Sequence, residues 1–261
     1  MLWYKAWLET RFRFLIAAAL MMGGSAFFVL GNPFILGTWR DWAQLHPSEA
    51  EQAWILRATV DYPYFIWHFV YRTMLQQLWV LCAVLIGLGG LPRESAQGAA
   101  GFTLSLPASR RRMVSVRSAV GCVEIAMLGL IPALVIPALS IFIEKPYPTF
   151  QGLFHAALMV LGGVVFFSLG VFLSSLVQSE HTPALVGVAL VALFYFILTP
   201  YADEGVVEPL WLKLIDASRV MAGEPYQSQR STGPLPGVAM SLSIAAGLFY
   251  LSIKMTEKRD Y

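Results

Sequence analysis

The polar side chains that could take part in chemistry are few in this sequence and lie far apart. Glu124 is the one acid well inside an apolar run, while His68, His155 and His181 are scattered along the chain. No Cys or His pair has the spacing of metal ligands, and no G-x-x-x-x-G-K-[ST] motif is present to bind phosphates. An integral membrane enzyme needs several acids and histidines at one depth. The sequence therefore predicts no catalytic residue, metal or cofactor in this chain.

Glu124 still has to be accommodated among apolar neighbours. It lies seven residues beyond Arg117, which is about 10 Å along a helix, whereas Arg72 is expected much closer to the opposite membrane face. We expect a backbone or hydroxyl group to hold the carboxyl group, or the carboxyl group to be protonated. A proton relay is the alternative, although a lone acid does not make one.

A second group of polar residues follows one face of a predicted helix. His68, Arg72 and Gln76 occur at i, i+4 and i+8, with Gln77 beside them. Polar groups within a membrane usually face the bundle interior or a watery cavity. Two interpretations remain open: these residues line such a cavity, or His68 and Arg72 simply reach water at the outer interface.

The composition indicates that lipid is the solvent of most of this chain. Of the 261 residues, 57% are hydrophobic and 13% are charged, whereas soluble domains are about 25% charged. The net charge of +2 is too small to suggest nucleic acid as a partner. We therefore expect an all-α, multi-pass membrane protein.

The apolar runs predict six transmembrane helices in a single domain that covers residues 1–261. About 20 residues suffice for each crossing. An amphipathic interfacial helix is expected at 1–13, Gly31-Asn32-Pro33 should end the first span, and Pro132 and Pro137 should kink or break the third. The predicted spans are 14–30, 65–91, 113–143, 154–177, 183–199 and 238–253.

The basic residues predict that both termini are cytoplasmic. Most of the 18 Lys and Arg residues fall in 1–13, 93–117 and 254–261, and short loops rich in Lys and Arg stay inside. In the sixth span, Ala239, Ser243 and Gly247 form a stripe of small residues. Such a stripe is more often used for internal packing than for a dimer seam.

The interruption from Arg93 to Arg117 is the most distinctive stretch. Glu94 to Leu104 can form a short helix parallel to the membrane, and Pro107 and Ser109 then suit the start of the third span. The order of Glu94, Gly98, the phrase FTLSLP and an S-R-R-R run resembles the first cytoplasmic loop of type-2 ABC exporter permeases. Between Glu94 and Phe102 the chain departs from the usual pattern, because relatives carry more charge there and a Gly-Thr pair.

The resemblance implies that this loop is a coupling helix, cytoplasmic and between spans 2 and 3, which contacts a separate ABC ATPase through Glu94, Gly98, Phe102 and Leu104. ATP and Mg would bind that partner subunit. A second copy, or a similar permease chain, would complete a pathway between the second and fifth spans. The candidate pathway residues are His68, Arg72, Gln76, Gln77, Phe194, Tyr195 and Thr199.

The function implied is ATP-driven export of an amphipathic or hydrophobic cargo, such as a drug, peptide or lipid, across the inner (cytoplasmic) membrane. For the loop arginines alone, snorkelling anchors at span ends are the simpler interpretation. The alternative function is a non-transporting scaffold or sensor subunit that still binds an ATPase. An integral membrane enzyme is less favoured than either.

Overall fold

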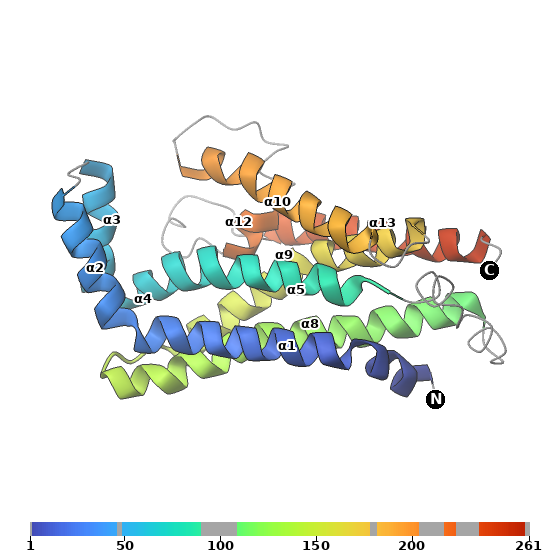
Figure 1. Cartoon of the computed structure of the whole chain (residues 1–261), viewed down its shortest axis with the longest axis horizontal. Helices are drawn as coiled ribbons and strands as arrows, with labels where there is room; N and C mark the ends of the chain where they lie inside the picture. The colour runs from blue at the N-terminus through green and yellow to red at the C-terminus, as the bar shows by residue number, and fades with distance from the viewer. Residues whose placement is uncertain are drawn as a thin grey trace.

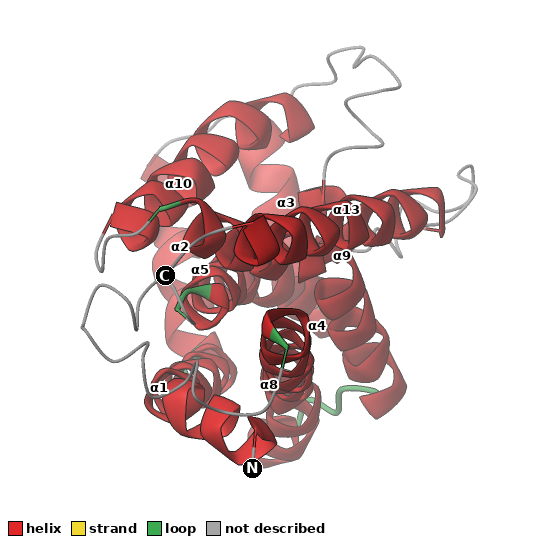
Figure 2. Cartoon of the chain, turned by 90° about the vertical axis from the view of Figure 1, so that its right-hand side faces the viewer, coloured by secondary structure: helices red, strands yellow, loops and turns green. Residues whose placement is uncertain are grey.

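The computed structural model describes residues 2–45, 49–89, 109–177, 182–203, 217–222 and 235–258. Every regular element within these ranges is helical (Figures 1 and 2), which confirms the predicted all-helical class. Five segments are long and apolar enough to cross a membrane: Leu2–Leu30, Tyr62–Gly87, Arg110–Ile143, Thr149–Leu176 and Leu235–Lys258. The predicted span 183–199 lies within helix α10 (Thr182–Asp203), whose part Thr182–Leu193 is apolar. A sixth crossing stays a prediction.

The N-terminal interfacial helix and the first span form one helix, α1 (Leu2–Leu30). No glycine or proline stands between residues 2 and 22, so nothing in the backbone interrupts the hydrogen bonds at Arg13. Gly31 makes a turn but does not end the helical path, because the N–H of Ile35 still donates to its carbonyl at 2.9 Å. Helix α2 (Asn32–Leu45) follows at once, with Pro33 in its first turn, where no N–H is needed.

The segment between the first two apolar runs is largely helical. Helices α2 and α3 (Glu49–Val60) lie at one end of the molecule, beyond the end of α1 (Figure 1). Aromatic packing holds α2 to the bundle, since the ring centroids of Trp39 and Phe69 are 4.1 Å apart. At the same end, Lys145 Nζ donates to Asn32 Oδ1 at 2.9 Å.

The second apolar run contains three consecutive helical elements. Asp61 caps α4 (Tyr62–Phe65) by accepting from the N–H of Tyr64. A π-helix, η1 (Ile66–Leu75), follows and leads into α5 (Gln76–Gly87) without a break. This run is therefore a continuous helical rod with a π segment in its first half.

The third run is α8 (Arg110–Ser140), which contains both Pro132 and Pro137 and is not broken by either. It passes into the short 3-10 helix η2 (Ile141–Ile143) and ends where Glu144 adopts a left-handed conformation, φ 57°. Residues 145–148 form no regular element, and α9 (Thr149–Leu176) begins after them.

Helix α9 is the centre of the bundle and packs against α5, α8, α12 (Ala217–Ala222) and α13 (Leu235–Lys258). Its crossing with α5 is close because Gly170 faces Gly87 and Val84. A Cβ on either glycine would collide with backbone atoms of the facing helix. Large side chains fill the space beyond the crossing, and Trp79 and Phe167 are fully buried there.

The small-residue stripe of the last helix is not used for internal packing. Ala239, Ser243 and Gly247 are exposed, and nothing lies near the position of a Cβ on Gly247. The packed face of α13 is instead formed by Ser241, Ala245, Ser252 and Thr256. The prediction of an internal seam at this stripe is wrong, because the stripe lies on the opposite face.

Several helices begin or end at one end of the molecule. The start of α1, the end of α5, the start of α8 and the end of α13 lie there, opposite α2 and α3 (Figure 1). Lys5, Arg11 and Arg13 are on α1, Arg110 to Arg112 on α8, and Lys254 and Lys258 on α13. Those basic residues used to predict topology that the structure describes are therefore at one end.

Candidate functional site

The predicted coupling residues Glu94, Gly98, Phe102 and Leu104 lie outside the described residues. Both points where this loop joins the bundle are described. Leu88 and Gly89 follow α5, and Ser109 precedes α8. The residues that contact these two junctions therefore determine how the loop is attached to the bundle.

Two arginines from different helices bond the carbonyls at the end of α5. Arg13 Nη1 of α1 donates to Leu85 O at 2.9 Å and to Leu88 O at 2.6 Å. Arg117 Nη2 of α8 donates to the same Leu88 O at 2.6 Å. The last carbonyls of a helix lack partners within the helix and carry its negative dipole end. Here the guanidinium groups donate hydrogen bonds to these carbonyls and place positive charge at the negative end of the helix dipole.

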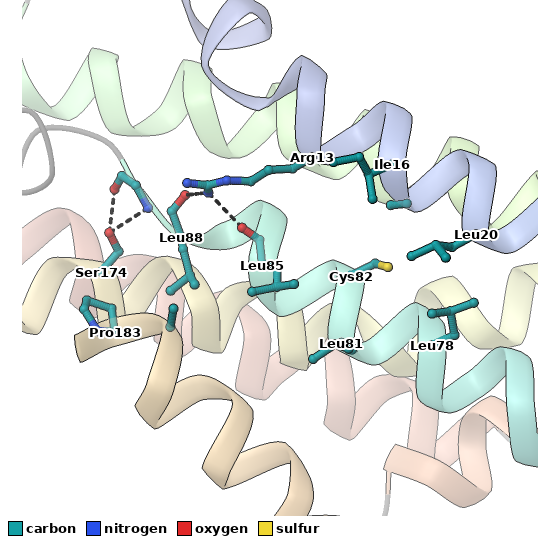
Figure 3. Close-up of a pocket in the computed structure, with 13 residues that line it drawn as sticks. Arg13, Ile16, Leu20, Leu78, Leu81, Cys82, Leu85, Leu88, Ser174 and Pro183 are labelled. Atoms are coloured by element: carbon teal, nitrogen blue, oxygen red, sulfur yellow. Dashed lines mark hydrogen bonds between the residues drawn. The ribbon is translucent and has the colours of Figure 1, made fainter. Parts of the chain in front are cut away.

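A third helix joins this junction through Ser174 of α9. The Ser174 Oγ donates to Gly89 O at 2.5 Å, and the Gly89 N–H donates to the Ser174 Oγ at 2.9 Å (Figure 3). Gly89 has φ 120°, a conformation that side chains with a Cβ rarely adopt. The chain thus leaves α5 at a position that is bonded to α1, α8 and α9.

The two arginines differ in how their charge is balanced. Arg117 Nε lies 3.2 Å from Glu9 Oε2 of α1, and Lys5 Nζ lies 3.8 Å from the other oxygen of Glu9. Among the described residues no carboxylate contacts Arg13. Two guanidinium groups therefore meet at one carbonyl, and within the described ranges a carboxylate contacts only that of Arg117.

The other junction is a regular helix start. Ser109 Oγ accepts from the N–H of Arg112 at 3.3 Å, and Ser109 itself has extended dihedral angles. These are the properties of an N-cap residue. The prediction that Ser109 restarts a helix before the third span is confirmed.

Glu124 is buried deeper in the same part of the bundle, with 1% of its surface exposed. Its Oε1 is bonded to Thr10 Oγ1 of α1, while Oε2 has no hydrogen-bond partner. A hydroxyl group therefore holds the carboxyl group, which is one of the arrangements expected from the sequence. The partner comes from a helix start that was expected to lie in the headgroup region.

The polar residues of the second run are divided between two helical elements. His68 and Arg72 lie in η1, where hydrogen bonds run from i to i+5, and Gln76 begins α5. The His68 ring stacks on Tyr64 at 5.3 Å, and the Arg72 guanidinium lies 5.9 Å from the Trp67 ring centroid. Both side chains are half-buried.

Gln76 and Gln77 point in different directions. Gln76 is 2% exposed, and its Nε2 donates to Ser218 O of α12 at 3.0 Å. Trp67 Nε1 donates to Ala222 O of the same short helix at 2.9 Å. Gln77 is exposed. Gln76 therefore anchors α12, a contact that the sequence did not indicate because it joins residues 142 positions apart.

The remaining pathway residues, Phe194, Tyr195 and Thr199, lie on the helix α10. Their side chains are outside the described part of the structure. Whether they face His68, Arg72 or Gln77 stays a prediction.

A cavity of about 340 Å³ lies beside Arg13, between α1, α5 and α10 (Figure 3). Apolar side chains such as Ile16, Leu20 and Leu81 line most of it, and Ser174 and Arg13 mark its polar end. Sequence reasoning missed this site, although a cation at the edge of an apolar run was its available signal. Within the described ranges, no group of three or more His, Cys, Asp or Glu residues could hold a metal ion.

Comparison with known proteins gives one result that covers most of the chain. The model of a family described as ABC-2 family transporter protein matches residues 14–221. This match includes both loop junctions, Glu124 and the polar residues of the second run. A search of curated proteins finds no match.

Proposed function

The chain belongs to the ABC-2 family of transporter membrane proteins, and from this membership we propose that it is the permease subunit of an ATP-driven exporter. Permease domains of this family are multi-pass membrane proteins that leave ATP hydrolysis to a partner ABC ATPase. The family match over residues 14–221 is the observation that carries the proposal.

Within this function, the loop between α5 and α8 is the contact with the ATPase, through Glu94, Gly98, Phe102 and Leu104. The bonds at Leu88 and Gly89 support this role. A displacement of the loop would act directly on α5, and the side chains of Arg13, Arg117 and Ser174 connect α5 to three other helices. Through these hydrogen bonds, a displacement of α5 would be transmitted to α1, α8 and α9.

The proposed cargo is amphipathic or hydrophobic, and it moves outward across the cytoplasmic membrane through a pathway shared by two copies of the chain. His68, Arg72, Gln76, Gln77, Phe194, Tyr195 and Thr199 remain its candidate lining. The exposed position of Gln77 and the half-buried positions of His68 and Arg72 are compatible with a surface that a second copy completes. Gln76 contributes by holding α12 in place.

The test is a charge reversal at the proposed ATPase contact. We expect Glu94→Arg to abolish transport and cargo-stimulated ATPase activity in reconstituted vesicles, without loss of membrane insertion. Asp41→Arg is the matched control, since this exposed acid lies on α2 at the opposite end of the molecule (Figure 1). Normal coupled activity in the Glu94 variant would refute the assignment of this contact.

A non-transporting scaffold or sensor subunit would also bind an ATPase. The same vesicles separate the two functions, because a scaffold would retain the ATPase at the membrane while no cargo accumulates. Movement of an amphipathic cargo that requires ATP would exclude the scaffold.

A further inference from the structure

We propose that the cavity between α1, α5 and α10 is a binding site for one anionic phospholipid, with an acyl chain along the cavity and the phosphate beside Arg13. This site lies within one chain. Lipid binding at this site can be measured without the ATPase, so its test does not depend on the transport function.

The length of the cavity fits one leaflet of a bilayer. Its lining on α5 extends from Leu78 to Leu88, a rise of about 15 Å at 1.5 Å per residue. The hydrocarbon core of a membrane is about 30 Å thick, so this length corresponds to one leaflet. The volume of about 340 Å³ is at the small end of known ligand sites, about 300–1,000 Å³. One acyl chain fits such a space, and a whole lipid molecule does not.

The charge at the polar end selects the headgroup. A guanidinium group is always protonated and has five N–H donors. Of these donors, Nη1 bonds Leu85 O and Leu88 O, and Figure 3 shows the Arg13 side chain extending from α1 toward Leu88. No carboxylate contacts Arg13 in the described parts of the chain. A phosphate diester can accept from the remaining donors and neutralise the charge.

Arg117 is an arginine at the same junction whose charge is balanced by a carboxylate of the protein. It bonds the same Leu88 carbonyl, but Glu9 lies 3.2 Å from its Nε. Among the described residues, a carboxylate therefore contacts one arginine of the pair and none contacts the other. The arginine that has no such contact within these ranges is the one that lines the cavity.

The surroundings favour a lipid over a water-soluble anion. Leu15, Ile16 and Leu20 of α1 are exposed on its outer surface, which is expected where a helix meets lipid or another membrane helix. The basic ends of α1, α8 and α13 lie together at this end of the molecule (Figure 1). Basic pockets between membrane helices on the cytoplasmic side are known to bind anionic headgroups.

The experiment is a lipid titration of the purified full chain in mild detergent, read by native mass spectrometry. Phosphatidylglycerol, phosphatidylcholine and glycerol phosphate are the three probes. We expect one phosphatidylglycerol per chain, bound about fivefold more tightly than phosphatidylcholine. Both lipids have a phosphate diester, but the choline cation cancels its charge, and attraction of a net anionic lipid to a basic residue contributes about 1 kcal/mol. Glycerol phosphate should bind far more weakly, since it has no acyl chain.

Two pairs of variants test the two ends of the site separately. Arg13→Gln should lower phosphatidylglycerol affinity about tenfold, while Arg11→Gln should not, because Arg11 is exposed and lies over the Phe12 ring. Ala184→Phe should fill the cavity from α10 and remove lipid binding with Arg13 intact. Leu185→Phe is its control, since Leu185 is 71% exposed.

Several outcomes would overturn the proposal. Equal binding by the Arg13 and Arg11 variants would show that the charge at this site does not select the lipid, and unchanged binding by Ala184→Phe would exclude the cavity. Tight binding of glycerol phosphate would make the site one for free anions. Loss of the lipid whenever the chain forms a dimer would assign the cavity to a second copy.

Discussion

Two arginines bond the carbonyl of Leu88, and the sequence predicted their location but not their role. Arg117, as a loop arginine, was expected to anchor a span end by reaching water, which cations at such positions commonly do. Arg13 was expected on the interfacial helix at 1–13. In the structure both turn inward to the end of α5. The bonded partners are 75 and 29 residues away in the chain, and no short-range pattern reports contacts at such separations.

Glu124 and Thr10 form the other residue-scale feature of functional interest. The Thr10 hydroxyl lies within bonding distance of Glu124 Oε1, and also 3.2 Å from Ala6 O. A hydroxyl group has a single hydrogen. If Thr10 donates to Ala6, the carboxyl group must be protonated to donate to Thr10, and if Thr10 donates to Glu124, the carboxyl group only accepts. In both cases removal of the hydroxyl leaves Glu124 without its hydrogen-bond partner.

We predict that Thr10→Val destabilises the chain by about 1–3 kcal/mol, the cost of leaving a buried polar group unsatisfied. The measurement is thermal unfolding in detergent, followed by tryptophan fluorescence. The double variant Thr10→Val with Glu124→Leu should recover much of this loss, because replacing both partners by apolar groups is nearly neutral. The cycle therefore isolates the pair.

Thr38→Val is the control for this cycle. Its hydroxyl is exposed and donates only within its own helix, to Phe34 O at 3.1 Å. We expect little change in its unfolding temperature. Additive effects of the Thr10 and Glu124 changes would show that the two side chains do not stabilise each other.

At the scale of elements, hydropathy located the second run but could not reveal its π segment. The predicted span 65–91 contains η1 and α5, and both segments are apolar. A π-helix differs from an α-helix in its backbone bonding, from i to i+5, and this difference leaves composition unchanged. The predicted alignment of His68, Arg72 and Gln76 assumed 3.6 residues per turn throughout.

The consequence can be tested with two adjacent glutamines. We predict that Gln76→Leu loosens α12, because it removes the donor to Ser218 O, and that Gln77→Leu does not, because Gln77 is exposed. The measurement is the rate of maleimide labelling of Met221→Cys, with Cys82 and Cys122 replaced by alanine. Met221 is 3% exposed, so labelling reports separation of α12 from the bundle.

We expect labelling to be about fivefold faster with the Gln76 change, since a lost hydrogen bond weakens local packing by about 1 kcal/mol. Equal rates for the two glutamine variants would show that the Gln76 contact does not hold α12. In that case Gln76 would be available to line the pathway as the sequence suggested.

The boundary between α1 and α2 was also predicted differently from the sequence. Gly31-Asn32-Pro33 was expected to stop the helix, and instead α2 begins at Asn32 directly after α1, with Pro33 in its first turn. Proline ends a helix only where its missing N–H or its ring conflicts with the preceding turn, and at a first turn neither does. The sequence shows the proline but not the turn into which it falls.

At the scale of the whole molecule, the composition and the basic clusters were the reliable signals. They predicted an all-helical protein with six transmembrane helices, and the described parts of the structure contain five helices long and apolar enough to cross a membrane. They also grouped segments 1–13, 93–117 and 254–261, whose described residues lie at one end (Figure 1). The cavity and the helix contacts required the structure, because they depend on which faces meet.

The central claim is that this chain works as a membrane subunit with a separate ATPase. Its most direct test is to purify the tagged full chain from its host's membranes in mild detergent and identify its companions by mass spectrometry. We predict recovery of a subunit that carries a P-loop, and loss of that subunit when Glu94 is replaced by Arg. Recovery of the chain without any nucleotide-binding companion, under conditions that preserve other membrane complexes, would contradict the account.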